Sequence, residues 1–315
     1  MKKYDIVSIG EALIDFTDLG MSENGMKIFE RNPGGAPANV ACAAARLGLS
    51  SVFIGKVGDD MHGECIIDAM ANCGVITEHM TRDADHFTTL AFVTLDENGD
   101  RSFSFARKQS ADVMLSDEDI SREVLADTKV LHFGSLSFTA EPSKSAVYAA
   151  IKYAKEHGAV ISYDPNYRPL LWDSEEVAIE EMRAPLSLVD VIKLSDNECE
   201  LVCGTSDFDA AARVLLDKGV KVVLLTCGGD GARIYFGDEC VIVPSEKVKV
   251  CDTTGAGDSF LGGFMYKLIR DGGANTSLTR ETAESYGAFA NRVAGKCVRK
   301  RGAIPALPTL EEVEE

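Results

Sequence analysis

The second half of the chain alternates between short apolar runs and longer stretches in which apolar residues recur every three or four positions. The apolar runs predict buried strands at residues 130–133, 160–163, 191–194 and 222–226. The longer stretches predict helices at residues 142–157, 175–184 and 208–218. Gly158 and Gly219 follow two of these helices, at the position where a left-handed residue ends a helix. This alternation predicts βαβ units and a mainly parallel sheet.

The first half continues the same pattern. It predicts strands at residues 6–9 and 52–54 and helices at residues 37–47 and 62–72. No internal repeat, low-complexity tract or long linker interrupts the chain. We therefore expect a single α/β domain over residues 1–315.

One segment has the two-residue period of strands with one polar face. Residues 88–95 and 101–107 alternate apolar and polar positions on either side of Asn98-Gly99, a pair that favours a type I′ hairpin turn. We predict an antiparallel hairpin that pairs with residues 27–31 and forms a lid. The lid would be built from inserted segments at about 15–33 and 86–110.

Composition and charge exclude several classes of protein. The formal net charge is −18, with 32 Lys and Arg against 50 Asp and Glu, so nucleic acids and anionic membranes are not expected partners. Acidic residues interrupt any secretory signal at the amino terminus, and no apolar run approaches the roughly 18 residues of a membrane span. The nine cysteines are an odd number, mostly within apolar runs, which is typical of free thiols in a reducing cytosol. We expect a cytoplasmic protein.

Polar residues and glycines follow the predicted strands. They are Gly10 with Asp15, Asp164 with Asn166, Ser195 with Glu198, Thr226 with Gly228, and residues 252–258. In a parallel sheet these positions share the edge at which α/β proteins bind ligands. Any one of them could also be an ordinary turn residue, but together they predict one cleft.

The glycine-rich run at residues 252–258, Asp-Thr-Thr-Gly-Ala-Gly-Asp, is the strongest local signal. It lies between a strand-like segment at 247–251 and a predicted helix at 259–270. Free N–H groups at a helix start bind anions, and a carboxylate beside them is well placed to take a proton from a hydroxyl that attacks a phosphate. This predicts a phosphate cradle with Asp258 as base. The alternative is a glycine-rich turn in which Asp258 only stabilises the helix dipole.

A second run, Pro33-Gly-Gly-Ala-Pro-Ala-Asn39, leads into the predicted helix at 37–47. Its glycines expose backbone amides, and Asn39 both donates and accepts hydrogen bonds, which suits a polyhydroxylated ligand. The alternative is an ordinary helix start with Pro37 in the first turn.

Together the two runs resemble the signatures of the ribokinase/PfkB family of carbohydrate kinases, and the resemblance extends over essentially the whole chain. The first signature is matched by Gly34, Gly35, Pro37, Asn39, Ala41, Gly48 and Gly58. The second is matched by Asp252, Thr253, Gly255, Ala256, Gly257, Asp258, Gly262 and Gly263. The resemblance implies a ribokinase-like three-layer α/β/α fold with a mainly parallel central sheet and a small antiparallel β lid. It also implies that Asp258 is the base and that Gly255, Ala256 and Gly257 form the anion hole.

Within that family the chain is most similar to the fructokinases, through residues 10–15, 105–112, 164–168 and 302–308. By this resemblance the sugar would contact Asp15, Gly34, Gly35, Asn39, Phe105, Arg107 and Asp164. ATP would contact Lys193, Ser195, Glu198, Thr226, Gly228, Gly231, Ala288 and Asn291. Glu198 would hold Mg²⁺ through water, and Asp252, Thr254 and Gly302 match the region of a monovalent-cation site that would take K⁺.

One element departs from the family pattern. The family's Asn-x-x-Glu is here Ser195-Asp-Asn-Glu198, and a register that uses Asn197 and Glu200 stays open. A basic cluster at residues 299–301 is either an ATP-facing patch or a solvated turn.

The expected activity is the ATP- and Mg²⁺-dependent transfer of the γ-phosphoryl group to a primary hydroxyl of a free hexose, with fructose converted to fructose 6-phosphate. A 2-keto-3-deoxygluconate kinase is the alternative, because Arg107 could bind a substrate carboxylate. A non-catalytic sugar or nucleotide sensor on the same fold is a third reading. An exposed face of the lid sheet also suggests a homodimer formed through the lid.

Overall fold

The computed structural model describes residues 2–95 and 101–315. Its central sheet has nine strands in the order β13-β12-β11-β10-β9-β8-β1-β4-β5. The strands are β1 Tyr4–Ile9, β4 Ser51–Gly58, β5 Met80–Asp83, β8 Thr128–Gly134, β9 Val160–Asp164, β10 Val191–Ser195, β11 Val222–Thr226, β12 Ala232–Phe236 and β13 Glu239–Val243. All neighbouring strands are parallel except β11 with β12 and β12 with β13. The predicted mainly parallel sheet is confirmed.

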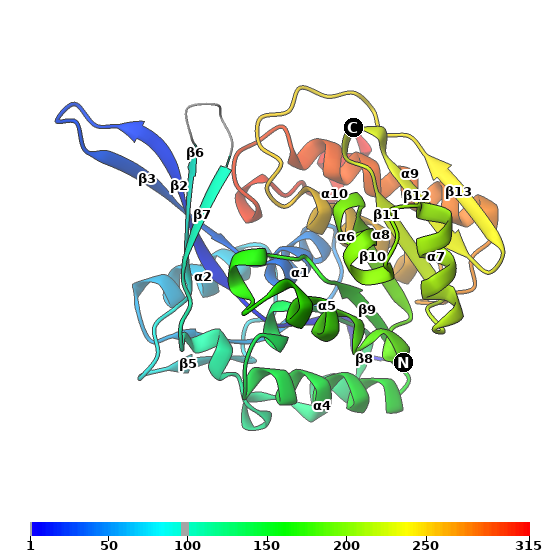
Figure 1. Cartoon of the computed structure of the whole chain (residues 1–315), viewed down its shortest axis with the longest axis horizontal. Helices are drawn as coiled ribbons and strands as arrows, with labels where there is room; N and C mark the ends of the chain where they lie inside the picture. Colours follow the sequence, from blue (N-terminus) through cyan, green and yellow to red (C-terminus); the bar gives the residue numbers. More distant parts are fainter. Residues whose placement is uncertain (1, 96–100) are drawn as a thin grey trace.

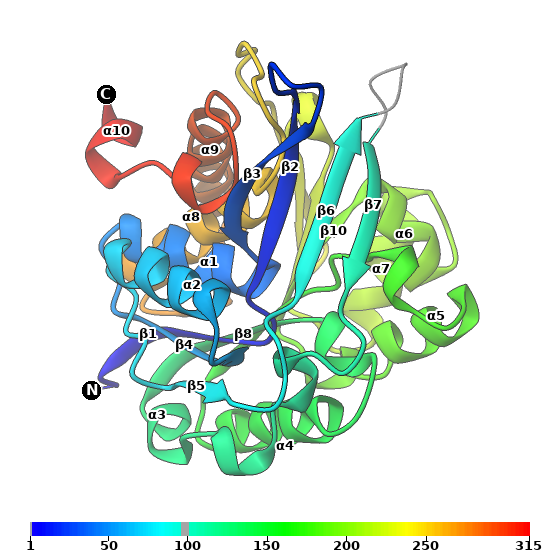
Figure 2. The ribbon, with the colours of Figure 1, turned by 90° about the vertical axis from the view of Figure 1, so that its left-hand side faces the viewer.

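Helices cover both faces of this sheet, because alternate strand residues point to opposite sides. Ile6, Val130 and Val191 belong to one apolar cluster with Phe264, whereas Val7, Leu131 and Ile192 belong to the other. The first side carries α1 Ala36–Arg46, α2 Met61–Asn72, α8 Ala256–Arg270 and α9 Arg280–Cys297, with α10 Leu310–Glu314 against α9. The second carries α3 Arg122–Ala126, α4 Ser143–Glu156, α5 Glu175–Arg183, α6 Asp196–Cys203 and α7 Phe208–Asp217. Figure 1 and Figure 2 show the resulting layers, which confirm the predicted ribokinase-like α/β/α fold.

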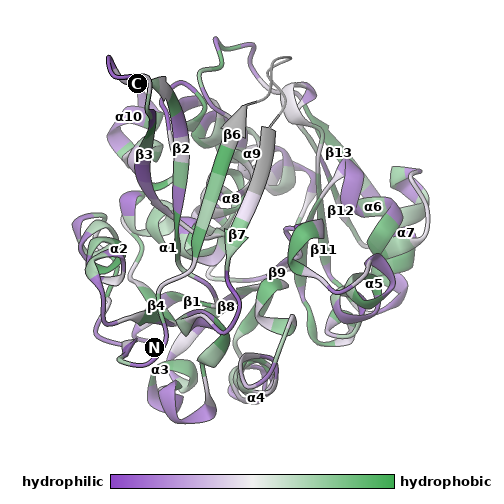
Figure 3. Cartoon of the chain, turned by 60° about the vertical axis from the view of Figure 1, so that its left-hand side comes forward, coloured by the Kyte–Doolittle hydropathy of each residue, from purple (hydrophilic) through white to green (hydrophobic). Residues whose placement is uncertain are grey.

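The helices are amphipathic in the way this layering requires. Figure 3 shows polar and apolar residues on different sides of helices such as α4. Among the described helices, none has the length and apolar character needed to cross a membrane.

A second sheet of four strands, in the order β3-β2-β6-β7, stands over the carboxyl ends of the central strands (Figure 2). We call it the small sheet. It consists of β2 Leu13–Met21, β3 Lys27–Gly34, β6 Leu90–Leu95 and β7 Arg101–Ala106. The antiparallel pairing of β6 with β7 confirms the predicted hairpin, although the proposed turn at Asn98-Gly99 lies outside the described residues.

The predicted partner of that hairpin was wrong. The hairpin pairs with β2 and not with residues 27–31. Strand β6 runs parallel to β2, with Leu90 opposite Ile14. β3 pairs with the other edge of β2. The strand β2 was not predicted because a register shift between Asp18 and Gly20 interrupts its pattern, and its exposed end includes Leu19 and Met21.

The strand-like segment predicted at residues 247–251 does not form a strand. It belongs to neither sheet, although the backbone N–H of Cys251 donates to the carbonyl of Val298 at 2.8 Å. Its apolar residues are not buried: Val250 is 53% exposed. The alternation of valine and lysine there therefore reflects an extended loop without a strand partner.

Candidate active site

A cavity of about 640 Å³ lies where the carboxyl ends of the central strands approach the small sheet. The small sheet contributes Asp15, Thr17 and Phe105 to its wall. From the central layers come Gly35, Asn39, Asn166, Lys193, Ser195, Glu198 and residues 251–258. The structure therefore brings together most of the polar positions that follow the strands, from segments far apart in the sequence.

The amino terminus of α8 forms one side of the cavity. Gly255 precedes the helix with φ +75°, and a Cβ there would lie 3.0 Å from the Cβ of Ala303. A Cβ on Gly257 would lie 2.9 Å from the Lys193 Nζ. The N–H of Ala256 already donates to Thr253 O at 3.2 Å, whereas the first turn of a helix leaves the following N–H groups without intrahelical partners. These glycines allow the helix start to approach both neighbours and a bound anion.

Asp258 lies in this first turn and is 8% exposed. The Asn39 Nδ2 donates to the Asp258 Oδ2 at 2.7 Å. Burial raises the pKa of Asp258, while the hydrogen bond from Asn39 opposes that rise. The two residues meet because α1 crosses α8 closely: a Cβ on Gly262 would lie 2.5 Å from the Ala43 Cβ. The result is a buried carboxylate held in one orientation on the cavity wall.

A buried ion pair lies beside Asp258. The Lys193 Nζ is 2.9 Å from the Asp164 Oδ2, at the ends of β10 and β9. Burial opposes the charge of Lys193, but the carboxylates of Asp164, Glu198 and Asp258 raise its pKa above the ordinary value. Lys193 lines the cavity, whereas Asp164 does not and lies behind it. The structure thus places a permanent positive charge next to the start of α8.

Glu198 joins β10, α6 and the segment after β9. Its Oε2 accepts hydrogen bonds from the backbone N–H and the hydroxyl of Ser195, both at 2.8 Å, and its Oε1 accepts one from the N–H of Tyr167 at 2.8 Å. Burial would raise the pKa of Glu198, but Lys193 and these donors lower it overall. Ser195 therefore caps α6 in a capping box with Glu198. Glu198 lines the cavity and Glu200 is exposed, which favours the register that uses Glu198.

Asp252, Thr254 and Gly302 are linked by hydrogen bonds. The Asp252 Oδ1 accepts from the N–H and the hydroxyl of Thr254 at 3.0 and 2.7 Å, and its Oδ2 accepts from the N–H of Gly302 at 3.0 Å. Gly302 has φ +79°. Asp252 therefore fixes the loop before α8 against the turn that contains Gly302.

Five of the predicted ATP contacts do not line the cavity: Thr226, Gly228, Gly231, Ala288 and Asn291. The Thr226 hydroxyl donates to Leu194 O at 3.3 Å, and a Cβ on Gly231 would lie 2.1 Å from Val243 O. The Asn291 Nδ2 donates to Val243 O at 3.0 Å and Pro244 O at 3.2 Å. Ala288 packs against the apolar cluster that contains Phe264 of α8. The five residues lie around β11, β12 and β13, and Thr226 is the strand partner of Ser195 on the cavity wall.

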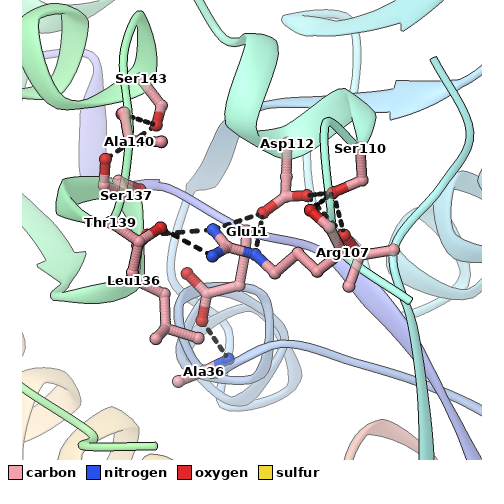
Figure 4. A network of polar contacts seen from close by, with 11 residues as sticks. Glu11, Ala36, Arg107, Ser110, Asp112, Leu136, Ser137, Thr139, Ala140 and Ser143 are labelled. Atoms are coloured by element: carbon pink, nitrogen blue, oxygen red, sulfur yellow. Dashed lines mark hydrogen bonds and ion pairs between the residues drawn. The ribbon is translucent and has the colours of Figure 1, made fainter. Parts of the chain in front are cut away.

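Arg107, at the end of β7, is buried and does not line the cavity. Its guanidinium donates to Asp112 from Nε at 2.9 Å, to Thr139 from Nη1 at 2.7 Å and to Leu136 O from Nη2 at 2.9 Å. Figure 4 shows this network. Gly34 also lies off the wall, where a Cβ would be 2.9 Å from the Asp15 Oδ2.

The cavity wall also includes residues that the sequence does not predict as site residues, among them Glu11, Thr17, Arg168 and Arg301. Glu11 directly follows Gly10 after β1, so the rule of polar residues after strands would have found it. Arg301 belongs to the basic cluster at residues 299–301, for which the sequence allows either an ATP-facing patch or a solvated turn. Arg168 belongs to the 164–168 stretch of the resemblance but is assigned no role there, and Thr17 carries no signal in the sequence.

An α/β/α fold with a helix start, a buried carboxylate and a small sheet around one cavity is the arrangement expected of a carbohydrate kinase. The sequence pattern described as pfkB family carbohydrate kinase matches residues 3–310. The chain therefore belongs to that family, as the resemblance predicted.

The relatives include fructokinases. The probable fructokinase-5 of Arabidopsis thaliana is 41% identical over 98% of this chain and 96% of its own length. The structure of a fructokinase from Xylella fastidiosa with bound ATP superposes with a TM-score of 0.93 at 34% identity, covering 100% of this chain and 98% of the other. A double-mutant fructokinase from Vibrio cholerae O395, bound to fructose, ADP and a potassium ion, gives a TM-score of 0.87 at 31% identity, with coverage of 100% and 98%.

Proposed function

We propose that this carbohydrate kinase transfers the γ-phosphoryl group of ATP to the primary hydroxyl of free fructose, giving fructose 6-phosphate. The observation that carries the proposal is Asp258, a buried carboxylate on the cavity wall, in the first turn of α8 and held by Asn39 at 2.7 Å. Its raised pKa gives it the basicity to take a proton from a sugar hydroxyl. The fructokinase relatives and the structures with ATP and with fructose support the choice of substrates.

In the proposed reaction Asp258 accepts the proton of the attacking hydroxyl. The start of α8 at Gly255, Ala256 and Gly257 would stabilise the charge that develops on the transferred phosphoryl group. Because the Ala256 N–H donates to Thr253 O, the donors would be the N–H groups of the first turn that follow it. Lys193 adds a fixed positive charge from beside Gly257. Donors fixed before the reaction need no rearrangement as the charge moves.

The sugar would bind between the small sheet and α1. Asp15, Gly35, Asn39 and Phe105 line that part of the cavity. The carboxylate of Asp15 and the amide of Asn39 can orient hydroxyls, and Phe105 can cover a carbon face. Gly34 leaves the space that the Asp15 carboxylate occupies, because a Cβ there would lie 2.9 Å from the Asp15 Oδ2. Asp164 and Arg107 would contribute indirectly, through Lys193 and through the end of β7 respectively.

The nucleotide would lie along the ends of β10 and β11. Its phosphates would approach Lys193, Ser195 and Glu198, and its base would lie near the segment formed by Thr226, Gly228, Gly231, Ala288 and Asn291. The hydrogen bonds from Asn291 hold residues 243 and 244 there, which gives the base a fixed wall.

Residues of this chain also fit the expected cations. Glu198 is an ionised carboxylate on the wall whose oxygens already accept three hydrogen bonds, so it suits contact with Mg²⁺ through water. Bound with ATP, Mg²⁺ would neutralise charge on the phosphates. Asp252, Thr254 and Gly302 supply oxygen ligands and an ordered loop for K⁺. Within residues 2–95 and 101–315, no three His, Cys, Asp or Glu side chains form a ready metal cluster.

A coupled ADP-release assay with fructose, 2-keto-3-deoxygluconate, ribose, tagatose and adenosine tests the proposal. Fructose should give the largest kcat/KM. Preference for 2-keto-3-deoxygluconate would establish the alternative kinase, although the donors of Arg107 that suggested it are engaged with Asp112, Thr139 and Leu136. Sugar binding without ATP consumption would instead indicate a sensor.

We also infer that the small sheet is the lid of a single domain over residues 1–315, built from segments at about 15–33 and 86–110, and that it pairs two copies of the chain. The support is the exposed apolar group Leu19, Met21, Met26 and Ile28 on β2, β3 and their connection. Sedimentation equilibrium should give a dimer, and Met21→Ser/Met26→Ser should weaken it. A wild-type monomer at micromolar concentration would contradict the pairing.

The nine cysteines are all free thiols, which supports a reducing compartment such as the cytoplasm. Localisation of a tagged chain tests this part of the proposal.

A further inference from the structure

Glu11 is a buried acid whose position the phosphoryl transfer described above does not use. It lies between β1 and β2 and is 2% exposed. Its Oε1 accepts the backbone N–H of Ala36 at 3.2 Å. Its Oε2 has no hydrogen-bond partner in the described part of the chain. A half-satisfied carboxyl in such a place is costly, so it needs a physical reason.

One side of Glu11 holds the start of α1. Gly35 precedes this helix with φ +107° and gives it no side-chain cap. The Glu11 carboxyl takes that place at Ala36, and a Cβ on Gly35 would lie 2.6 Å from Glu11 O. Asn39 follows in the first turn, where its N–H donates to Gly35 O at 2.8 Å. The contacts of Glu11 therefore fix the end of α1 from which Asn39 reaches Asp258.

The other side of Glu11 faces the base of the small sheet. Figure 4 shows its carboxyl on the side of the Arg107 guanidinium, with no hydrogen bond drawn between the two, and the charge of Arg107 acts on Glu11. Asp112 accepts hydrogen bonds from Arg107 at 2.9 Å and from the Thr89 hydroxyl at 2.6 Å. Thr89 precedes β6 and Arg107 follows β7, so one buried cluster anchors both strands.

We propose that Glu11 is a positioning residue that joins the base of the small sheet to the start of α1 and thereby sets the hydrogen bond from Asn39 to Asp258. Glu11 acts through Asn39 and needs no contact with the sugar. The inference rests on the proposed role of Asp258 and adds a residue to it. Arg107 and Asp112 are the charged groups that act on Glu11, with opposite signs.

Two substitutions separate the contacts of Glu11. Glu11→Gln keeps an acceptor for the Ala36 N–H, and Glu11→Ala removes it. We expect Glu11→Ala to lower kcat about 100-fold, because a displacement of about 1 Å can have that effect, with little change in KM for ATP. Glu11→Gln should remain within about 3-fold of wild type, since it retains the acceptor.

The acid limb of the pH profile gives a readout that a general loss of stability would not change. The Asn39 hydrogen bond lowers the pKa of Asp258, so its loss should move the acid limb of kcat/KM to higher pH in Glu11→Ala, as in Asn39→Ala. In the double variant the effect of Glu11→Ala should disappear. Asp190→Asn is the matched control: Asp190 is a buried carboxylate that accepts the Ile161 N–H at 3.0 Å, and its change should leave the limb in place.

The ¹³C chemical shift of the Asp258 carboxyl, titrated without substrates and assigned with Asp258→Asn, provides the same pKa independently of turnover. If wild type phosphorylates none of the sugars, the proposed function fails while this measurement still decides the role of Glu11. An unshifted Asp258 pKa in folded Glu11→Ala, or independent effects of Glu11→Ala and Asn39→Ala, would overturn the inference. If Glu11→Ala does not fold, Glu11→Asp, whose shorter side chain withdraws the acceptor, is titrated in the same way.

Discussion

The crossing of α1 and α8 and the small sheet border the same cavity, but the chain holds them in different ways. At the crossing, Gly262 packs against Ala43, and Asn39 holds Asp258 by a buried hydrogen bond. The small sheet has an exposed end at Leu19 and Met21 and is fixed mainly at its base. We expect the closely packed crossing to be the rigid region that carries the proposed chemistry, and the more exposed small sheet to cover the sugar. This division suits an enzyme that must open for its substrate and keep its catalytic groups in place.

The largest expected effect tests the rigid region. Asp258→Asn keeps the size of the side chain and removes the base, so kcat should fall by about 10²–10⁴-fold with a modest change in the KM for fructose. Steady-state ADP release measures both constants. Turnover close to that of wild type would show that Asp258 is not the base.

The next prediction concerns the base of the small sheet. Arg107 and Asp112 form an ion pair with 5% and 1% side-chain exposure and a closest distance of 2.8 Å. Asp112→Ala leaves the guanidinium without its charged partner, so it should lower the free energy of unfolding by about 3–5 kcal/mol. Urea denaturation measures the loss.

The matched control is Asp117→Ala. Asp117 pairs with Arg122 at the same distance of 2.8 Å, but the two side chains are 59% and 50% exposed. Its loss should change stability by no more than about 1 kcal/mol. Similar losses in the two variants would contradict a buried anchor at the base of the small sheet.

A smaller effect concerns the pH dependence of stability at Glu11, between the two regions. Burial raises the pKa of Glu11 from 4.5 to about 7, although Arg107 opposes the rise. The folded protein therefore holds the proton more tightly, and the stability gained from Glu11 is complete below about pH 4.5 and is lost as the pH rises through about 7. As the pH rises from 5 to 8, the free energy of unfolding of Glu11→Gln should increase by about 3 kcal/mol relative to that of wild type. A constant difference in Tm across this range would show that Glu11 ionises normally.

The same contrast explains what could be predicted from the sequence. Strands β8 to β11 and their helices carry local periodicity, so their existence and parallel order followed from residues close together in the chain. The glycine runs around Asn39 and Asp258 located the reactive end by local chemistry. The hydrogen bond that joins them spans 219 positions and required the folded chain.

The small sheet was harder for a physical reason. β2 pairs with β6 across more than 70 residues, and neither strand indicates its partner. Arg107 shows the same limit. Asp112 is near in sequence, but Leu136 and Thr139 come from the segment after β8, so only the fold shows that the donors of Arg107 are engaged and that Arg107 does not line the cavity.

The smallest expected effect lies on the covering side of the cavity. Phe105 of β7 lines the cavity from the small sheet, whereas Asp258 lines it from α8, so we expect the Phe105 ring to contact a bound sugar without touching Asp258. Phe105→Ala should raise the KM for fructose about 10-fold through lost apolar contact and leave kcat within about 3-fold. Phe105→Leu should restore most of the affinity, because it returns much of the buried area. A fall in kcat comparable to that of Asp258→Asn would mean that the small sheet takes part in the chemical step, and the separation between a rigid catalytic region and a covering region would then be wrong.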